Sequence, residues 1–201
     1  MTAKELRQYF GRYEHLGTHV ISESGTELIG KAPHIGNCAW LFEIFSPITD
    51  NELSEMEAKL ECAIPHTYKM FLCHCSNGLR LFVDTLNLFG RRENYNRDIV
   101  SAYQPYDIIT LNNRERPKDA TEDMFFIGSY DWDGSLVYIS RTDNKVHLCK
   151  NNSARSLYEW ETFDIFLQSE ITRLDKLFDD NGIELDFSSP TIPIFRKGGE
   201  R

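Results

Sequence analysis

Three short segments in the second half of the chain carry a strand pattern, and the turns between them decide how they pair. The segments are residues 124–130, 135–140 and 146–150. Asp133-Gly134 is a residue pair preferred in tight two-residue hairpins, and residues 142–145 (Thr-Asp-Asn-Lys) favour a second turn. Strands joined by such short turns run in opposite directions. The sequence therefore predicts an antiparallel meander.

Apolar residues at helical spacing predict helices before and after the meander, over residues 3–13, 49–64, 65–78, 106–113 and 162–182. Thr49 and Glu52 have the spacing of a capping box, in which each side chain accepts a hydrogen bond from the other residue's amide. Asn77-Gly78 and Gly182 are expected to end the helices over residues 65–78 and 162–182, because glycine adopts the left-handed conformation without strain.

The remaining segments complete an α+β fold. One or two short strands are expected within residues 79–89, a polar loop over 91–104, and irregular structure over 18–48 with one strand near residues 40–45. A chain of 201 residues buries enough surface for one core. We therefore expect a single domain with a central, mainly antiparallel sheet and flanking helices. Its parts are an amino-terminal extension (1–48), the main domain (49–182) and a carboxy-terminal strap (183–201).

Acidic residues are concentrated in two stretches of the chain. The formal net charge is −9, which disfavours a protein that grips nucleic-acid phosphates. Residues 119–143 carry −5 and residues 159–186 carry −7, so the rest of the chain is slightly basic. A solvated face that keeps the protein soluble is one interpretation, and a surface that steers a cationic partner is the other.

Aromatic residues alternate with acids inside both stretches, in Tyr-Asp-Trp-Asp at 130–133 and in Tyr-Glu-Trp-Glu at 158–161. Aromatic side chains supply contact area at protein interfaces, and acids attract a basic partner. Trp160 has a competing role in the core, ahead of the last helix. The candidate contacts are the 130–133 hairpin, the acids before the meander and a loop around 159–161: Glu122, Asp123, Tyr130, Asp131, Trp132, Asp133, Glu159 and Glu161.

No motif for catalysis, metal binding or cofactor binding is found. Cys62, His66, Cys73, His74 and Cys75 are crowded, but Cys73 and Cys75 lie on different faces of a helix and no second cysteine pair follows at zinc-ribbon spacing. Nucleophile elbows, phosphate loops and dinucleotide fingerprints are missing. We expect no catalytic residues, metal or cofactor, although a Cys/His/Asp assembly from distant segments stays open.

The sequence favours a cytoplasmic protein. It has no apolar run long enough for a membrane span and no secretory signal at residues 1–7, and its five cysteines lack the spacing of a disulfide framework. The basic stretches at 91–97 and 114–118 are interrupted by acids, so we interpret them as ordinary loops and expect no direct contact with nucleic acid or membrane.

The order of these motifs over residues 49–175 resembles the SUKH superfamily, whose best-known branch is named after the Smi/Knr fungal cell-wall regulators. The matching residues are Leu60, Ile64-Pro65, Tyr68, Phe71-Leu72, Asn77-Gly78, residues 86–90, Asn112-Asn113, residues 125–128, Asp133-Gly134, Val137-Tyr138, Lys145-Val146, Trp160, Phe163 and Phe166-Leu167. Glu61 and Ile64 replace the usual Gly and Leu of the motif, and a single Gly78 replaces a common glycine pair.

The resemblance implies an α+β fold with flanking helices and no catalytic residues. Bacterial members of this superfamily are mostly cytosolic immunity proteins that neutralise a cognate toxin, often a nuclease, by binding it. The resemblance therefore implies a non-enzymatic antitoxin whose partner is a toxin protein with a basic nuclease domain. A regulatory scaffold like the fungal branch is the alternative, followed by an uncharacterised hydrolase. The sequence does not indicate the oligomeric state.

Overall fold

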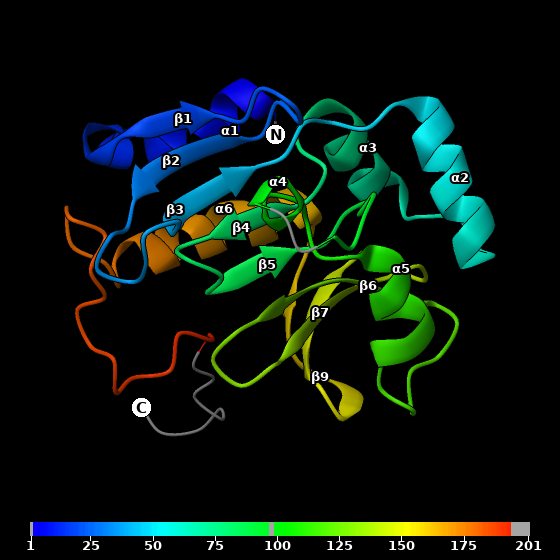
Figure 1. Ribbon diagram of the computed structural model, residues 1–201. Helices are drawn as coiled ribbons and strands as arrows, with labels where there is room; N and C mark the ends of the chain where they lie inside the picture. The colour runs from blue at the N-terminus through cyan, green and yellow to red at the C-terminus, as the bar shows by residue number, and fades with distance from the viewer. Residues whose placement is uncertain (1, 97–98, 194–201) are drawn as a thin grey trace, which may run out of the picture.

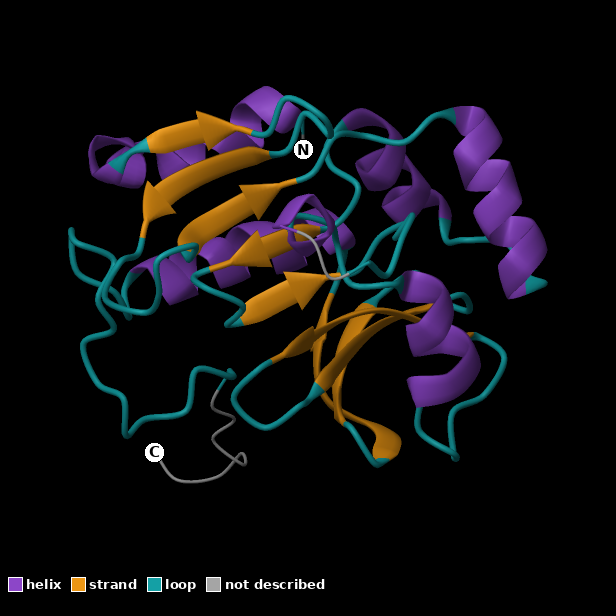
Figure 2. Ribbon diagram, viewed as in Figure 1, coloured by secondary structure: helices purple, strands orange, loops and turns teal. Residues whose placement is uncertain are grey.

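The computed structural model describes residues 2–96 and 99–193. Within them, nine strands form one antiparallel sheet whose spatial order follows the chain (Figures 1 and 2). The strands are β1 (Thr18–Val20), β2 (Glu27–Lys31), β3 (Trp40–Ile44), β4 (Leu79–Leu81), β5 (Leu86–Leu88), β6 (Met124–Tyr130), β7 (Leu136–Ser140), β8 (Val146–Lys150) and β9 (Ser153–Trp160). This sheet and its helices confirm the predicted α+β class.

Helices flank the sheet in the described part of the chain. They are α1 (Ala3–Phe10), a 3₁₀ helix η1 (Gly11–Leu16), α2 (Asp50–Leu60), α3 (His66–His74), α4 (Ile99–Ala102), α5 (Ile108–Thr110), a π-helical turn η2 (Leu111–Glu115) and α6 (Phe163–Asp175). The predicted capping box of α2 is present, because Thr49 Oγ1 accepts from the Glu52 amide at 3.3 Å and Glu52 Oε2 accepts from the Thr49 amide at 2.8 Å. The helix α3 ends at His74 with Cys75 as its C-cap, so the predicted end at Asn77-Gly78 is wrong, although Gly78 does take the left-handed conformation, with φ of 86°.

The predicted meander is confirmed as β6, β7 and β8, but its first turn is longer than expected. The Tyr130 amide donates to the Ser135 carbonyl at 2.9 Å, so residues 131–134 form a four-residue loop. The predicted two-residue hairpin at Asp133-Gly134 is therefore wrong. Asp133 instead accepts the Ser135 amide at 2.9 Å, and Gly134 takes the left-handed conformation with φ of 71°.

The strand expected near residues 40–45 is confirmed as β3, whereas the irregular structure expected over the rest of residues 18–48 is wrong. These residues form β1, β2 and β3, which extend the sheet beyond β4. All three residues of β1 are exposed, so this edge strand carries no alternating pattern. Gly30 has φ of 70° and interrupts the apolar pattern of β2. Inside the loop expected over 91–104, the short helix α4 forms.

The segment that follows β8 is a strand, although the sequence suggested a loop around residues 159–161. Val146 pairs with Trp160 and His147 with Glu159, and the register shifts between Leu148 and Lys150. Five successive residues of β9, 155–159, are exposed. An exposed edge strand with a bulge lacks the periodicity by which strands are recognised.

The last helix ends at Asp175, seven residues before the predicted end at Gly182. Beyond it, Phe178 stacks on Phe82 with ring centroids 4.5 Å apart, and Leu177 is only partly buried. Stacking on Phe82 requires the chain to leave the helical path, and the Asp179 carbonyl then accepts the Gly182 amide in a turn. Of the predicted carboxy-terminal strap, residues 194–201 lie outside the described residues.

The two faces of the sheet differ in character. One face packs on α1 and α6, as shown by the Phe10–Phe42 stack and the hydrogen bond from Tyr130 to Glu170 (Figure 1). The residues that alternate with these along each strand point to the opposite face of the sheet, which we call the open face. In register across β2 to β6, it carries Leu28, Glu43, Arg80, Asn87 and Ser129.

Candidate functional site

The eight candidate contact residues do not lie on one surface. Glu122 and Asp123 precede β6, whereas Asp131, Trp132 and Asp133 follow it. This strand is seven residues long, which corresponds to about 23 Å. Because Met124 pairs with Ser140 and Val146 with Trp160, the acids Glu159 and Glu161 lie at the same end of the sheet as Glu122. The acidic stretches of the sequence therefore form two separate surfaces.

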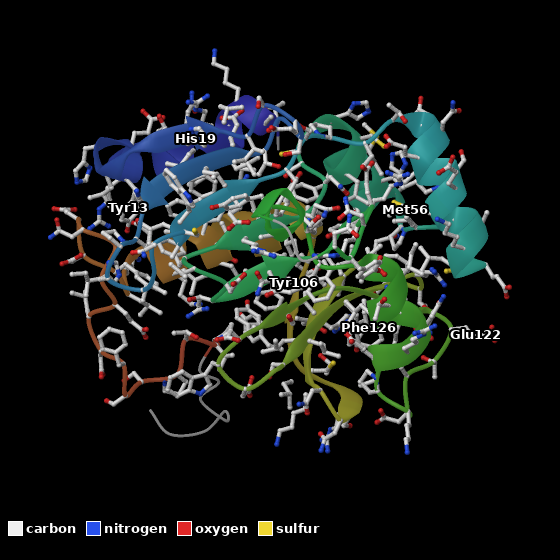
Figure 3. All side chains as sticks on the ribbon, viewed as in Figure 1. Tyr13, His19, Met56, Tyr106, Glu122 and Phe126 are labelled. Atoms are coloured by element: carbon white, nitrogen blue, oxygen red, sulfur yellow. The ribbon has the colours of Figure 1, made fainter. Side chains whose placement is uncertain are left out.

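The first surface, at the end of the sheet with Glu122, Asp123, Glu159 and Glu161, is partly neutralised. Lys145 Nζ lies 2.8 Å from Glu159 Oε1 and 2.9 Å from Glu161 Oε1. Hydrogen bonding to Lys145 lowers the pKa of Glu159. Nearby, the Arg141 guanidinium donates to the Glu122 carbonyl at 2.6 Å. Figure 3 shows Glu122 at the periphery of the molecule. Lys145 and Arg141 therefore reduce the negative electrostatic potential at this end of the sheet.

The second surface is the loop of residues 131–134. Asp131 and Asp133 are exposed, and within the described residues neither is part of an ion pair. Between them, the indole of Trp132 is 42% exposed. A large aromatic side chain between two unpaired carboxylates is the combination that the sequence suggested for a contact with a basic partner.

Tyr130 and Trp160, which come from the two segments where aromatic residues alternate with acids, belong to the core. Tyr130, a candidate contact, is fully buried and donates to Glu170 Oε2 at 2.6 Å, so its inclusion among the contact residues is wrong. Its burial follows from strand alternation, which turns Tyr130 towards α6 when Ser129 faces the open side. Trp160 is also buried, with its ring 4.9 Å from that of Phe166.

Beside the 131–134 loop, the open face carries a groove that sequence reasoning missed. Its volume is about 550 Å³. Its walls come from four places: strands β5 and β6, residues 92, 95, 106 and 107, the turn α5–η2 and the loop 131–134. The lining side chains include Asn87, Phe89, Tyr95, Tyr106, Glu115 and Asp131. Figure 3 shows Tyr106 near the middle of the molecule.

Two arginines fix the described residues of the segment between β5 and α5: Arg91 joins it to α2 and to Asn77, and Arg92 joins residues of this segment to one another. Arg91 lies 3.0 Å from Glu52 Oε1, and its backbone amide donates to Asn77 Oδ1 at 2.7 Å. Arg92 donates to the carbonyls of Asn94, Pro105 and Ser101 at 3.1 to 3.3 Å. Both guanidinium groups therefore stabilise the fold itself, which agrees with interpreting this basic stretch as an ordinary loop.

A buried charged cluster lies under the edge of the groove, on the open face. Arg80 lies 3.2 Å from Glu43 Oε2 and 3.4 Å from Asp84 Oδ1, and it stacks over the Tyr106 ring at 4.7 Å. Burial raises the pKa of Glu43 to about 7, because the cost of burying the carboxylate outweighs its attraction to Arg80. Burial also raises the pKa of Asp84. One arginine is therefore shared by two carboxyl groups in this cluster.

The cysteines and histidines that crowd the sequence near residue 62 separate in space. Cys75 is buried, His66 and His74 are exposed, and Cys62 Sγ accepts from the Arg141 guanidinium at 2.9 Å. Among residues 2–96 and 99–193, no three His, Cys, Asp or Glu side chains are placed to hold one metal ion. None of the helices in this part of the chain has the length and apolar character that crossing a bilayer requires.

A protein-family model described as SMI1 / KNR4 family (SUKH-1) matches residues 47–169. This range contains β4 to β9, the groove and both acidic surfaces, whereas β1 to β3 lie outside it. No curated protein sequence matches the chain.

Proposed function

Since the chain belongs to the SMI1/KNR4 (SUKH-1) family, we propose that it is an immunity protein, which binds a cognate bacterial toxin domain and neutralises it. The toxin we propose is a nuclease with a basic surface. Neutralisation then consists of covering or distorting the nuclease site, and the immunity protein itself performs no catalysis. The proposed site of action is the cytoplasm, where the substrates of such a toxin are found.

The loop 131–134 carries this proposal. Asp131 and Asp133 are exposed without an ion-pair partner among the described residues, and Trp132 offers a large apolar surface between them. Carboxylates of this kind attract a basic partner over a distance of about 10 Å at moderate salt, and an aromatic anchor then slows dissociation. The open groove beside this loop adds a concave surface into which the partner fits.

The acids at the opposite end of the sheet contribute less to the proposed contact. Lys145 lies between Glu159 and Glu161, so a basic partner would have to compete with a cation that is already in place. Exposed ion pairs are weak, and this competition is therefore modest, but it favours the 131–134 end.

Co-expression with the product of the neighbouring gene tests this function. We expect the two proteins to co-purify as a complex, and the toxin's nuclease activity to be lost in that complex. The association rate should fall as salt is raised, because steered encounters are screened. A complex that forms without loss of toxin activity would support the regulatory scaffold instead, and the absence of a complex would contradict the proposal.

A further inference from the structure

We propose that the groove beside the 131–134 loop binds an arginine side chain of the protein partner. The identity of that partner rests on the proposed function, whereas the chemistry of the groove rests on four observations. These are its place at the acidic loop, its charge, an unpartnered hydrogen-bond acceptor in its floor and the two tyrosine rings along its wall.

The position of the groove makes it continuous with the acidic loop. Asp131 and Gly134 line it from the loop, and Ser129 lines it from β6. A partner that contacts Trp132 therefore reaches the groove with the next side chain. Because the groove is open to solvent along the sheet, a long flexible side chain can enter it without any movement of the backbone.

The groove favours a cation. Asp107, Glu115 and Asp131 line it against one cation, Arg92. Asp107 caps α5 by accepting the amides of Ile109 at 3.2 Å and Thr110 at 3.1 Å. The positive charge of Arg92 is directed at three backbone carbonyls. Glu115 and Asp131 have no ion-pair partner within the described residues, so their charge remains available to a ligand.

The floor of the groove contains an acceptor that lacks a donor. Asn87 is 4% exposed and lines the groove, and its Nδ2 donates to the Asp84 carbonyl at 2.7 Å. Its Oδ1 has no hydrogen-bond partner among the described residues. This oxygen is buried within the floor, and a buried acceptor without a partner costs free energy, which a donor brought by a ligand would recover when the Asn87 side chain turns towards it. The ligand is therefore a hydrogen-bond donor as well as a cation.

Two tyrosine rings select arginine rather than lysine. Tyr95 and Tyr106 line the groove, and the Tyr95 hydroxyl donates to Asp107 Oδ2 at 2.7 Å, which fixes its ring. Both rings already stack with guanidinium groups of the chain, from Arg92 at 5.3 Å and from Arg80 at 4.7 Å. A planar guanidinium with five donors stacks on such rings and still reaches carboxylate and amide oxygens, which a compact ammonium group does less well.

A capped tripeptide, acetyl-Gly-Arg-Gly amide, tests the inference with the whole protein and without the toxin. Its binding is followed by the NMR shifts of the protein's backbone and tyrosine rings during titration. Matched peptides carry citrulline, which has the shape of arginine without the charge, or lysine. We expect saturable shifts at Tyr95, Tyr106 and Asn87 with the arginine peptide, weaker binding with lysine and none with citrulline.

Variants locate the binding site. Asp131→Asn and Tyr106→Leu should each weaken the arginine peptide about fivefold. Tyr106→Phe keeps the ring, and Glu161→Gln removes an acid at the opposite end of the sheet, so both should bind like the unchanged protein. Binding of citrulline equal to that of arginine, loss of affinity in Glu161→Gln alone, or no shift at the groove would overturn the inference. None of these results depends on the toxin, so the proposed function is tested separately.

Discussion

The hydroxyl of Tyr130 donates a 2.6 Å hydrogen bond to Oε2 of Glu170, which joins β6 to α6 inside the core. Glu170 is only 2% exposed, and the same oxygen accepts from Arg173 Nη2 at 2.6 Å. Burial and the Glu170 carboxylate hold the pKa of Tyr130 well above its usual range. A tyrosine that sequence patterning assigned to the surface is therefore part of a buried polar network.

Tyr130→Phe removes one of the three hydrogen bonds to this oxygen of Glu170, of which Arg173 donates the other two, and leaves the packing of the ring unchanged. We expect the free energy of unfolding to fall by about 2 kcal/mol, because the lost hydrogen bond is to a buried carboxylate. Urea denaturation measures this change. Affinity for the protein partner should stay the same. A loss of affinity without a loss of stability would indicate that Tyr130 contacts the partner.

Glu43→Gln should change how stability depends on pH. The carboxyl group has a folded-state pKa of about 7 and an ordinary value of 4.5. Between these values the unfolded chain releases the proton and the folded chain retains it, so Glu43 lowers stability as pH rises through this range. Below pH 4.5 the carboxyl is protonated in both states, and above pH 7 its full cost is present.

Urea denaturation of both proteins between pH 4.5 and pH 8 checks this effect. The free energy of unfolding of the unchanged protein, relative to Glu43→Gln, should fall by about 3 kcal/mol across the range. Asp84 is present in both proteins, so only its coupling to Glu43, directly and through Arg80, enters the comparison. A difference that stays constant with pH would show that folding does not raise the pKa of Glu43.

Gly128→Ala should disrupt the pairing of β5 with β6, which forms the floor of the groove. A Cβ atom at Gly128 would overlap the backbone carbonyl oxygen of Asn87, which cannot move without breaking the sheet. We expect a loss of about 3 kcal/mol in the free energy of unfolding. Gly36→Ala is the matched control, because nothing lies within 4 Å of its added Cβ. Equal stability of the two variants would mean that β5 and β6 lie further apart.

Local signals predicted much of this fold from the sequence. Thr49 and Glu52 cap α2 through contacts only three residues apart, and β6 to β8 have apolar patterns bounded by turn residues. The match to the family model over residues 47–169 confirms the resemblance found in these motifs. The spacing of residues in the sequence predicted those elements whose stabilising interactions lie close together in the chain.

Residue spacing did not predict the edge strands or the contacts between residues far apart in the chain. Strand β1 is fully exposed, and the bulge in β9 removes alternation, so neither shows a pattern. The early end of α6 depends on Phe178 reaching Phe82, which lies about a hundred residues away in the chain. Composition also does not reveal that the acidic residues form two surfaces at opposite ends of β6. The register of the sheet decides this.

Inhibition of the cognate toxin domain by two double variants tests the central claim most directly. Asp131→Asn/Asp133→Asn removes the charges of the 131–134 loop and keeps the hydrogen bond to the Ser135 amide, whereas Glu159→Gln/Glu161→Gln removes the acids paired with Lys145. We predict that the unchanged protein inhibits the toxin, that the first variant inhibits about tenfold more weakly at low salt, and that the second inhibits like the unchanged protein. Equal inhibition by both variants, or a loss confined to the second, would contradict the account.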